Sequence, residues 1–400
     1  MKYLCLSASL IARRLALLAL LGTCLVAQAQ TRVLVNPGDQ GEQSRFAVYN
    51  DWKVAVEQAL RKAAPGNTVA SVMLSTDATA DLQTTRSRIH DVYVAPAHVV
   101  GSAVRYGYTP VLGLERSVQA VLVAPAEGAI SSLAQAQDKR LGLPMQDSVV
   151  TYLLRGEVNA ANTTIKRHFG PLFQTRYQDA LLPCLQLRRC DVVAVERAVF
   201  DRWVAAGEKL RVIMETRTAP GLSVAVRDDS KINVAAFRTA LTDALAASAV
   251  LNDGSKTVAL KGDDFNYVST LGYFTPRSLG GAQVVDAAAV AQMLQRGARY
   301  IDTRTETEFK AGHVPGAKLV PYVEKSAKDA DYEASLDQFD TSQLGADRGA
   351  ELIFACNGAE CWKSYKASQA ALKAGFTKVH WFRGGFPEWR HTGQKIATAG

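Results

Sequence analysis

The chain has 400 residues, of which 48% are hydrophobic and 21% are charged, and this ordinary globular composition predicts two or three folded domains. The formal net charge is +8, but the lysines and arginines are scattered among acids and form no basic run. The charge pattern therefore gives no support to nucleic-acid binding, although a mildly positive surface suits small anionic ligands.

The first 29 residues have the pattern of a secretory signal peptide. Lys2 and two arginines precede an apolar run over residues 15–26, and small residues follow at 27–29 as a cleavage site. The apolar run is too short to span a bilayer, which takes about 20 residues. We therefore expect residues 1–29 to be removed and the protein to be exported to the periplasm.

From Arg32 onward, short apolar runs alternate with helical patterns. This alternation predicts an α/β domain with a mainly parallel sheet. The expected strands cover residues 32–36, 68–74, 91–95, 119–124, 140–143, 191–195 and 222–226. The expected helices include residues 51–62, a segment that begins near Asp77, and residues 233–247.

Near Thr275 the pattern starts again as a second, smaller α/β unit. Pro276, Gly280 and Gly281 make a short stretch that is typical of a linker. The elements expected after it are helices over 286–295 and 363–374 and strands at 299–302, 351–355 and 378–382. The predicted organisation is one domain over residues 30–275, a linker over 276–283 and a second domain over 284–400.

A cysteine lies where the last-but-one of these strands ends. The loop Cys356-Asn-Gly-Ala-Glu-Cys-Trp362 follows, and a helical pattern begins at once. Backbone N–H groups without partners converge between a strand end and a helix start, and with the helix dipole they favour a thiolate or an anionic persulfide. We therefore expect Cys356 to be the nucleophile, and Gly358 allows the tight fold that such a cradle needs. The cradle residues are Asn357, Gly358, Ala359 and Glu360.

After the signal peptide the cysteines form two close pairs, Cys184 with Cys190 and Cys356 with Cys361. An exported protein can hold disulfides, so each pair is either a structural bridge or a pair of free thiols. For Cys184 and Cys190 we expect the structural disulfide. Cys361 either resolves a persulfide or sulfenate on Cys356 by forming a disulfide, or bridges it permanently, and a permanent bridge excludes a persulfide.

Further motifs surround the cysteine loop. They are Tyr-Ile-Asp-Thr-Arg at 300–304, Glu308, Gly-His-Val-Pro-Gly-Ala at 312–317, and Phe-Arg-Gly-Gly-Phe-Pro-Glu-Trp at 382–389. In this order, and with the loop, they resemble the rhodanese family over roughly residues 284–396. The resemblance implies a small α/β domain with a central parallel sheet, in which Cys356 takes sulfane sulfur from a donor such as thiosulfate and passes it on. It assigns mainly architectural roles to Asp302, Arg304, His313 and Gly316.

The loop departs from the family pattern in its length. Rhodaneses usually have an Arg-Ser pair soon after the cysteine, whereas here Lys363 and Ser364 come about two residues later, and the added length accommodates Cys361 and Trp362. We expect Lys363 to attract an anionic donor, as a point charge rather than a planar guanidinium. The related phosphatase loop would need arginine at Trp362, so hydrolysis of phosphate esters is not expected, and neither a metal nor a cofactor is implied.

Several stretches of the first domain carry a second resemblance. They are Phe-Ala-Val-Tyr-Asn-Asp-Trp at 46–52, Asp-Val-Tyr-Val-Ala-Pro-Ala at 91–97, Leu-Ala-Gln-Ala-Gln-Asp-Lys-Arg at 133–140 and Asp-Val-Val-Ala-Val-Glu at 191–196. Over about residues 32–273 the chain resembles periplasmic solute-binding proteins of the phosphonate-binding type. The resemblance implies two α/β lobes with a ligand cleft between them, and an ABC-type membrane transporter as a partner.

In that family a turn rich in serine and threonine at a helix N-terminus holds the anionic group. In the matching stretch here Ser148 is kept, Val149 and Val150 replace hydroxyl residues, and Thr151 stands where glycine is usual. The ligand is therefore open between a phosphonate, phosphate, a sulfur oxyanion and another small acid, and loss of the ligand function is also open. Other residues in segments that reach the cleft, as ligand contacts or as packing residues, are Tyr49, Tyr93 and Glu196.

The expected function is that of an exported sulfurtransferase. The second domain carries sulfane sulfur on Cys356 and passes it to a thiol or another acceptor, while the first domain binds a small anionic solute. The alternative is a periplasmic solute receptor whose rhodanese module is a redox-responsive or docking domain without turnover. A permanent bridge between Cys356 and Cys361 would favour that alternative.

Overall fold

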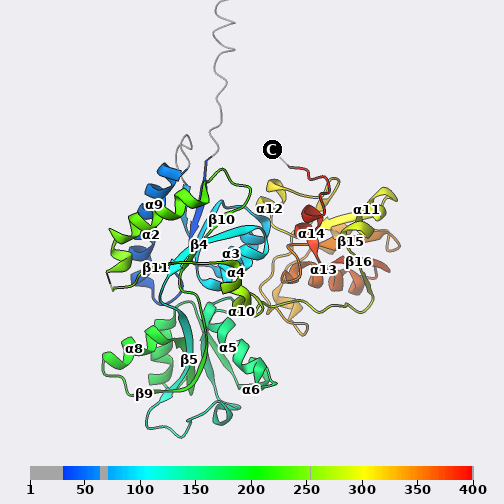
Figure 1. The fold of residues 1–400 in the computed structure, drawn as a ribbon. Coiled ribbons are helices and arrows are strands. Elements are labelled where there is room, and N and C mark those ends of the chain that lie inside the picture. The colour runs from blue at the N-terminus through cyan, green and yellow to red at the C-terminus, as the bar shows by residue number, and fades with distance from the viewer. Residues whose placement is uncertain (1–29, 64–70, 253, 399–400) are drawn as a thin grey trace, which may run out of the picture.

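The computed structural model describes residues 30–63, 71–252 and 254–398, and the expected signal peptide over residues 1–29 lies outside them. The described residues form a two-lobed α/β domain and a smaller α/β domain that contacts its side (Figure 1). Within these ranges no helix is long and apolar enough to cross a membrane.

The first lobe is built around a six-stranded sheet with the strand order β11-β4-β10-β3-β1-β2. Its strands are β1 (Arg32–Val35), β2 (Ser71–Leu74), β3 (Val92–Ala95), β4 (Tyr108–Leu114), β10 (Ser223–Arg227) and β11 (Thr257–Ala259). Its main helices are α2 (Glu42–Ala63), α3 (Ala78–Ser87), α4 (Ala97–Arg105) and α9 (Val234–Ala246). Successive side chains of a strand point to opposite faces, so Val33 packs toward α2 and α9 while Leu34 packs toward α3 and α4.

The second lobe has a five-stranded sheet with the order β7-β6-β8-β5-β9. Its strands are β5 (Val118–Pro125), β6 (Leu141–Pro144), β7 (Leu172–Thr175), β8 (Val192–Glu196) and β9 (Leu210–Ala219), and its helices are α5 (Val149–Ala160), α6 (Ile165–His168), α7 (Leu181–Gln186) and α8 (Arg197–Ala205). Leu153 of α5 packs on one face, in a core that continues into the first lobe, and Val199 of α8 packs on the other. Cys184 and Cys190, whose Cα atoms are 5.3 Å apart, are joined by a disulfide beside the second core.

Both sheets of this two-lobed domain are mixed, which differs from the mainly parallel sheet that the alternating pattern predicted. Strand β10 runs antiparallel to β3 and β4, and β5 runs antiparallel to β8 and β9. The chain passes from the first lobe to the second between β4 and β5 and returns between β9 and β10. A hydrophobic pattern marks a strand but not its direction, so the reversal at these crossings could not be predicted.

The C-terminal domain has a five-stranded sheet of order β12-β16-β15-β13-β14, and every pairing in it is parallel. Its strands are β12 (Ala282–Val284), β13 (Arg299–Asp302), β14 (Lys318–Leu319), β15 (Glu351–Ala355) and β16 (Lys378–Phe382), and its helices are α11 (Ala287–Gln295), α12 (Glu306–Ala311), α13 (Trp362–Lys373) and α14 (Gly385–His391). Val290 of α11 and Trp389 of α14 pack on one face, and Ala367 and Ala371 of α13 pack on the other. The central parallel sheet expected for this domain is confirmed, and it brings the carboxyl ends of β13 and β15 to one edge.

Short helical segments connect the larger elements. They are α10 (Asn266–Ser269) and the 3-10 turns η1 (Ala134–Ala136), η2 (Gln178–Ala180), η3 (Ala249–Leu251), η4 (Gly262–Phe265), η5 (Ala334–Leu336) and η6 (Thr341–Leu344). Among them, α10 packs against α4 close to the point where the chain leaves for the C-terminal domain (Figure 1).

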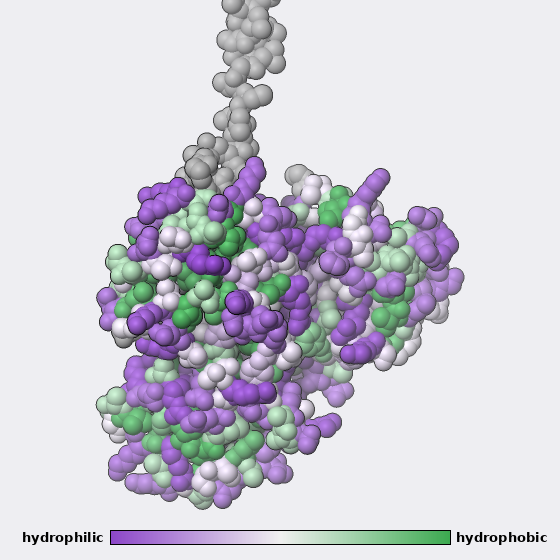
Figure 2. All heavy atoms as spheres, in the orientation of Figure 1, coloured by the Kyte–Doolittle hydropathy of each residue, from purple (hydrophilic) through white to green (hydrophobic). Residues whose placement is uncertain are grey.

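The C-terminal domain contacts both lobes of the first domain. It lies beside α3 and α4 of the first lobe (Figure 1), and it forms ion pairs with the second lobe through Lys166 with Asp329 and Asp147 with Lys328. Hydrophilic residues cover most of the face of both domains shown in Figure 2, with apolar residues in small separate groups. We call this contact between the domains the docked arrangement.

Candidate functional site

The loop that carries the predicted nucleophile begins at Cys356, directly after β15, and ends at Cys361, the residue before α13. Gly358 in its middle has a φ of +88°, a conformation that favours glycine, and the N–H of Cys361 donates to the Gly358 carbonyl over 3.0 Å. Gly385 passes so close that a Cβ on it would lie 2.1 Å from the Cys356 carbonyl oxygen. These two glycines allow the loop to form a tight turn at the carboxyl edge of the sheet.

The sulfur of Cys356 lies inside this turn. Its Sγ is 3.1 Å from the carbonyl oxygen of Cys361 and 3.1 Å from the hydroxyl oxygen of Ser364, which also accepts a hydrogen bond from the Trp381 indole. Both cysteines are free thiols in the structure, and only 1% of Cys356 and 4% of Cys361 is exposed. The loop therefore brings the two thiols together but covers both.

The two thiols are held in different electrostatic environments. Burial raises the pKa of Cys356 well above that of an ordinary thiol, and the neighbouring Cys361 raises it further. Burial also acts against ionisation of Cys361, but a hydrogen bond from the Cys356 thiol and the charges of Lys363 and Arg86 outweigh it and lower the pKa of Cys361 to about 7. In the docked arrangement the thiol that ionises more readily is therefore Cys361, whereas the position of the loop predicted a favoured thiolate on Cys356.

Asn357, the first cradle residue, faces the two-lobed domain. Its amide nitrogen donates to Glu308, and its Oδ1 lies 3.1 Å from the hydroxyl of Ser87 at the end of α3. The Ser87 hydroxyl is also 2.7 Å from Glu308 Oε1. The other Glu308 oxygen accepts from the N–H of Thr305 and so caps α12. One oxygen of Glu308 therefore accepts from Ser87 of the two-lobed domain and Asn357 of the sulfur loop, while the other caps α12 in its own domain.

The remaining cradle residues also meet the two-lobed domain. Glu360 lies 3.7 Å from the guanidinium of Arg86 in α3 and 3.3 Å from that of Arg105 in α4. The carbonyl of Ala359 accepts hydrogen bonds of 2.8 Å from both the N–H and the hydroxyl of Thr275. The two ion pairs of buried Glu360 and the two hydrogen bonds accepted by the Ala359 carbonyl therefore fix the loop against the two-lobed domain.

Lys363 and Trp362 continue the same contact into α13. The Lys363 ammonium donates a long hydrogen bond of 3.5 Å to the side-chain oxygen of Gln83 in α3. Lys363 itself is buried. The Trp362 indole donates to the Tyr273 carbonyl over 2.7 Å. The positive charge expected to attract a sulfur donor is therefore beside the thiols but turned toward the first lobe rather than toward solvent.

The residues assigned to architecture hold the domain together at the same edge. The guanidinium of Arg304 forms a buried ion pair with Asp302 and donates to the Gly312 carbonyl over 2.7 Å. His313 stacks on Phe309 and bonds its carbonyl over 2.9 Å. Gly316 has a φ of +79° at the turn before β14. The contacts of Asp302, Arg304 and His313 are made inside their own domain, and the hydrogen bonds of the Cys356 thiol go to other residues.

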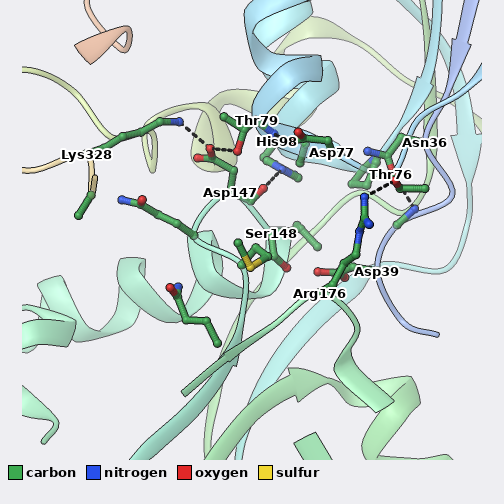
Figure 3. A pocket seen from close by; sticks show the side chains of 18 of the residues that line it. Asn36, Asp39, Thr76, Asp77, Thr79, His98, Asp147, Ser148, Arg176 and Lys328 are labelled. Carbon is green, nitrogen blue, oxygen red and sulfur yellow. Dashed lines mark hydrogen bonds and ion pairs between the residues drawn. The ribbon is translucent and has the colours of Figure 1, made fainter. Parts of the chain in front are cut away.

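A second candidate site is a cavity of about 610 Å³ between the two lobes (Figure 3). Both lobes and the segment 324–328 of the C-terminal domain line it. The first lobe supplies Asp39, Asp77 and His98, the second Asp147, Ser148 and Arg176, and the C-terminal domain Lys325 and Lys328. Figure 3 shows Lys328, Thr79 and His98 converging on Asp147, while Arg176 reaches Thr76 from the other side.

Asp147 is the centre of the polar contacts in this cavity. One of its carboxylate oxygens accepts hydrogen bonds of 2.6 Å from both Lys328 and Thr79. Burial acts to raise the pKa of Asp147, but Lys328 and the Thr79 hydroxyl outweigh it and hold that pKa below its usual range. The ring of His98 donates to the Asp147 carbonyl over 2.7 Å, and burial lowers the pKa of His98 to about 4, so this imidazole is neutral near pH 7.

Of the residues predicted for the cleft, Ser148 lines the cavity, where its hydroxyl caps α5 by accepting from the N–H of Val150 over 3.2 Å. Thr151 is buried and donates to the Met145 carbonyl over 3.1 Å. Tyr49 donates to the Val72 carbonyl, and Tyr93 donates to Thr84 within the core. The Glu196 carboxylate accepts from Gln40 and Gln178, and burial raises its pKa to about 7. These four side chains bond elsewhere and do not line the cavity.

The sequence pattern did not single out several residues that the structure brings to the cavity. Asp77 was noted only as a helix start, and it caps α3 through the N–H of Thr79 over 2.9 Å. Arg176, His98 and Lys328 lie in segments with no motif of their own. The residues around Lys328 in the sequence give no indication of its role because its partner, Asp147, is 181 positions away. Among the described residues no cluster of histidine, cysteine and acidic side chains could hold a metal ion.

Comparison with known proteins identifies both parts of the chain. Residues 43–265 match the family model described as "ABC transporter, phosphonate, periplasmic substrate-binding protein", and residues 286–392 match the model of the rhodanese-like domain. A structure of PhnD1 from Prochlorococcus marinus (MIT 9301) in complex with methylphosphonate shares 10% identity and a TM-score of 0.49, over 60% of this chain and 96% of that one.

Curated relatives match the C-terminal domain. Thiosulfate sulfurtransferase 16, chloroplastic, from Arabidopsis thaliana is 32% identical over 109 residues, which are 27% of this chain and 88% of the relative. Thiosulfate sulfurtransferase 18 from the same plant is 31% identical over 26% of this chain and 76% of the relative. The chain therefore belongs to the phosphonate-type periplasmic substrate-binding proteins of ABC transporters, and it continues into a C-terminal domain of the rhodanese-like family.

Proposed function

We propose that this protein is an exported sulfurtransferase that carries sulfane sulfur as a persulfide on Cys356, joined to a domain that binds a small anionic solute. The observation that carries the proposal is the position of Cys356, between the end of β15 and the start of α13, with a second thiol in contact. The similarity of this domain to two thiosulfate sulfurtransferases supports the same reading of the chemistry.

The sulfur-loading step needs a thiolate on Cys356. The Cys361 thiolate takes the proton of the Cys356 thiol, to which it is hydrogen-bonded. The Cys356 thiolate then attacks the outer sulfur of thiosulfate, the sulfur–sulfur bond breaks, and sulfite leaves with the electron pair. The product is an anionic persulfide, which the N–H and hydroxyl of Ser364 and the N-terminus of α13 stabilise.

The persulfide has two fates in this loop. A thiolate of an acceptor attacks the terminal sulfur, becomes a persulfide itself and returns Cys356 to the thiolate. In competition, Cys361, which is a thiol after loading, passes its proton to the terminal sulfur and attacks the inner sulfur, so that hydrosulfide leaves with the electron pair of the sulfur–sulfur bond and a Cys356–Cys361 disulfide remains. The second route discards the sulfur, so Cys361 acts as a proton acceptor during loading and as a resolving thiol afterwards.

The two-lobed domain supplies the solute half of the function. The expected solute is a small anion of the phosphonate, phosphate or sulfur oxyanion class, bound at the cleft cavity near Ser148 and the N-terminus of α5. Lys325 and Arg176 add positive charge to the same cavity. Periplasmic location after removal of residues 1–29, an ABC-type transporter as partner and a thiol as sulfur acceptor complete the proposal, and export suits the Cys184–Cys190 disulfide.

Mass spectrometry of the mature protein tests the sulfur half. After mild reduction and incubation with thiosulfate, we expect a mass gain of one sulfur atom on the peptide that contains Cys356, assigned to that residue by fragmentation. Cys356→Ser should abolish the gain, and Cys361→Ser, the matched control in the same loop, should keep it. Absence of any gain in the parent protein would overturn the sulfurtransferase and leave the receptor with a non-catalytic rhodanese-like module.

A further inference from the structure

Helix α3 lies between the two candidate sites. At its start, Thr79 donates to Asp147 in the wall of the cleft cavity. At its end, Ser87 hydrogen-bonds Asn357 in the sulfur loop. The helix has 10 residues, so roughly 15 Å separate its ends. In the docked arrangement, α3 therefore contacts the solute cavity at one end and the sulfur loop at the other.

The C-terminal domain forms a third wall of the cleft cavity. The segment 324–328 lines it, and the Lys328 ammonium lies 2.6 Å from the Asp147 carboxylate, with 9% and 3% of the two side chains exposed. The second lobe makes another ion pair with the same part of the C-terminal domain, between Lys166 and Asp329, at 2.9 Å. The cavity is therefore complete only while the C-terminal domain is docked.

Lys328 changes what this cavity can accept. Asp147 lies beside the N-terminus of α5, and an unpaired carboxylate there would repel an anion. Lys328 compensates that charge through the ion pair with the Asp147 carboxylate. The C-terminal domain thus supplies Lys325 and Lys328, two of the three cations that face the four carboxylates of the lining, so its docking shifts the charge of the cavity toward what a small anion needs.

Covering of the sulfur loop depends on the same contact. Cys356 and Cys361 are almost completely buried, and residues of α3, α4 and the segment 273–275 contact their loop. Cys356 is 1% exposed in the docked arrangement, so a donor or acceptor reaches its sulfur only after the loop is uncovered, and we infer that the C-terminal domain moves away from the first lobe for sulfur transfer.

We propose that the C-terminal domain completes the solute site, so that a small tetrahedral anion in the cleft holds this domain docked and keeps Cys356 covered. The proposal rests on the proposed function, because it takes the cleft as the solute site and Cys356 as the sulfur carrier. A ligand that contacts both domains binds the docked arrangement more tightly than the separated one. Solute binding and exposure of Cys356 therefore oppose each other, and each weakens the other by the same factor.

The test follows the reaction of Cys356 with iodoacetamide in the reduced full-length protein. Calorimetry first establishes which of phosphate, methylphosphonate and sulfate binds and at what concentration the site is saturated. At 100 times the dissociation constant, a ligand that binds only the docked form slows the modification of Cys356 by up to about 100-fold. Lys328→Gln should weaken anion binding and remove most of the protection. Lys310→Gln, which breaks an exposed ion pair with Glu306 on α12 of the same domain, is the matched control and should keep both.

Each other outcome overturns the proposal in a recognisable way. Binding of an anion without any slowing of Cys356 modification, or with faster modification, would remove the coupling and leave the solute-binding function intact. Equal affinity and equal protection in Lys328→Gln would show that the C-terminal domain is not part of the site. If none of the three anions binds, both this proposal and the solute half of the proposed function fail, whereas sulfur loading of Cys356 by thiosulfate would still support the other half.

Discussion

The hydroxyl of Ser87 lies 3.1 Å from Oδ1 of Asn357, although 270 positions and a domain boundary separate the two residues. Asn357 follows Cys356 directly, so a side chain of the solute-binding domain holds the residue next to the proposed sulfur carrier. This hydrogen bond is buried together with the ion pair of Arg86 and Glu360. The reactivity of Cys356 is therefore expected to depend on residues that no motif of the rhodanese-like domain contains.

Ser87→Ala should make Cys356 more accessible. The substitution removes a buried interdomain hydrogen bond, which stabilises the docked arrangement by about 1 kcal/mol, so the modification of Cys356 by iodoacetamide should speed up roughly five-fold. Ser335→Ala, which removes an exposed local hydrogen bond to Glu333, is the control and should react like the parent protein. If Ser87→Ala reacted at the parental rate, the docked arrangement would not limit access to the thiol.

A thiolate titration near pH 7 should belong to Cys361. The pKa of Cys361 is lowered to about 7 because, against the effect of burial, the Cys356 thiol donates a hydrogen bond to it and Lys363 and Arg86 add positive charge. The ultraviolet absorbance of the thiolate should therefore rise through pH 7 in the parent protein, and Cys361→Ser should lose this step.

Lys363→Gln should move the same titration to higher pH, since it removes one of the two nearby cations. Lys373→Gln, at the exposed end of the same helix, should leave it in place. A titration that survives in Cys361→Ser and disappears in Cys356→Ser would reverse the assignment of the acidic thiol.

The sequence predicted the strand, loop and helix around Cys356 well because all of their determinants are local. The strand, the cysteine, Gly358 and the helix start are within a few positions of one another, and β13, β15 and β16 fall within one residue of the expected strands. In contrast, β4 and β9 were not predicted, and they belong to the antiparallel crossings between the lobes. The direction of a strand and the partner of a crossing depend on long-range pairing, which a hydrophobic pattern does not contain.

The cleft was predicted less well for a related reason. Tyr93 and Thr151 lie in segments that match the family, but each side chain finds a partner in its own lobe, so a match of the segment did not identify a cavity residue. Lys328 and Ser87 look like ordinary polar surface residues until the second domain is placed against the first. Their roles arise from docking, and docking leaves no periodic signal in the sequence.

Asp81 should make the stability of the protein depend on pH. Burial raises the pKa of Asp81 to about 7, although hydrogen bonds from Ser75 and Asn36 oppose this shift. The folded protein therefore binds a proton that the unfolded chain releases near pH 4, and the contribution of Asp81 to stability is full below about pH 4 and is lost as the pH rises to about 7.

Asp81→Asn should remove that loss, because the amide is neutral at every pH and can donate to Ser75 while accepting from Asn36. The stability of the variant relative to the parent should then increase between pH 4 and 7, by up to about 1.4 kcal/mol per pH unit. Asp201→Asn, an exposed position on α8, should show a constant difference. Thermal or urea unfolding over this pH range measures both, and a relative stability of Asp81→Asn that falls with pH would contradict the sign.

The C-terminal domain should fold without the two-lobed domain and should then have more reactive thiols. A fragment that begins just before Leu279 contains all five strands of the parallel sheet and both apolar cores around it. It also keeps the packing of Leu279 against Trp362 and Trp381, which a later start would remove. The fragment loses the contacts of α3, α4 and Thr275 with the three loop residues Asn357, Glu360 and Ala359, which lie next to Cys356 in the full chain.

We therefore expect the fragment to unfold cooperatively, to take up one sulfur atom from thiosulfate on Cys356, and to react with iodoacetamide faster than the full-length protein. Circular dichroism and mass spectrometry measure the three properties, and the fragment with Cys356→Ser is the control for sulfur uptake. A fragment that does not fold would place the domain boundary elsewhere. A folded fragment that reacts no faster than the full chain would mean that the two-lobed domain does not shield the thiol, and a folded fragment that takes up no sulfur would mean that Ser87, Arg86 or their neighbours are required for the chemistry itself.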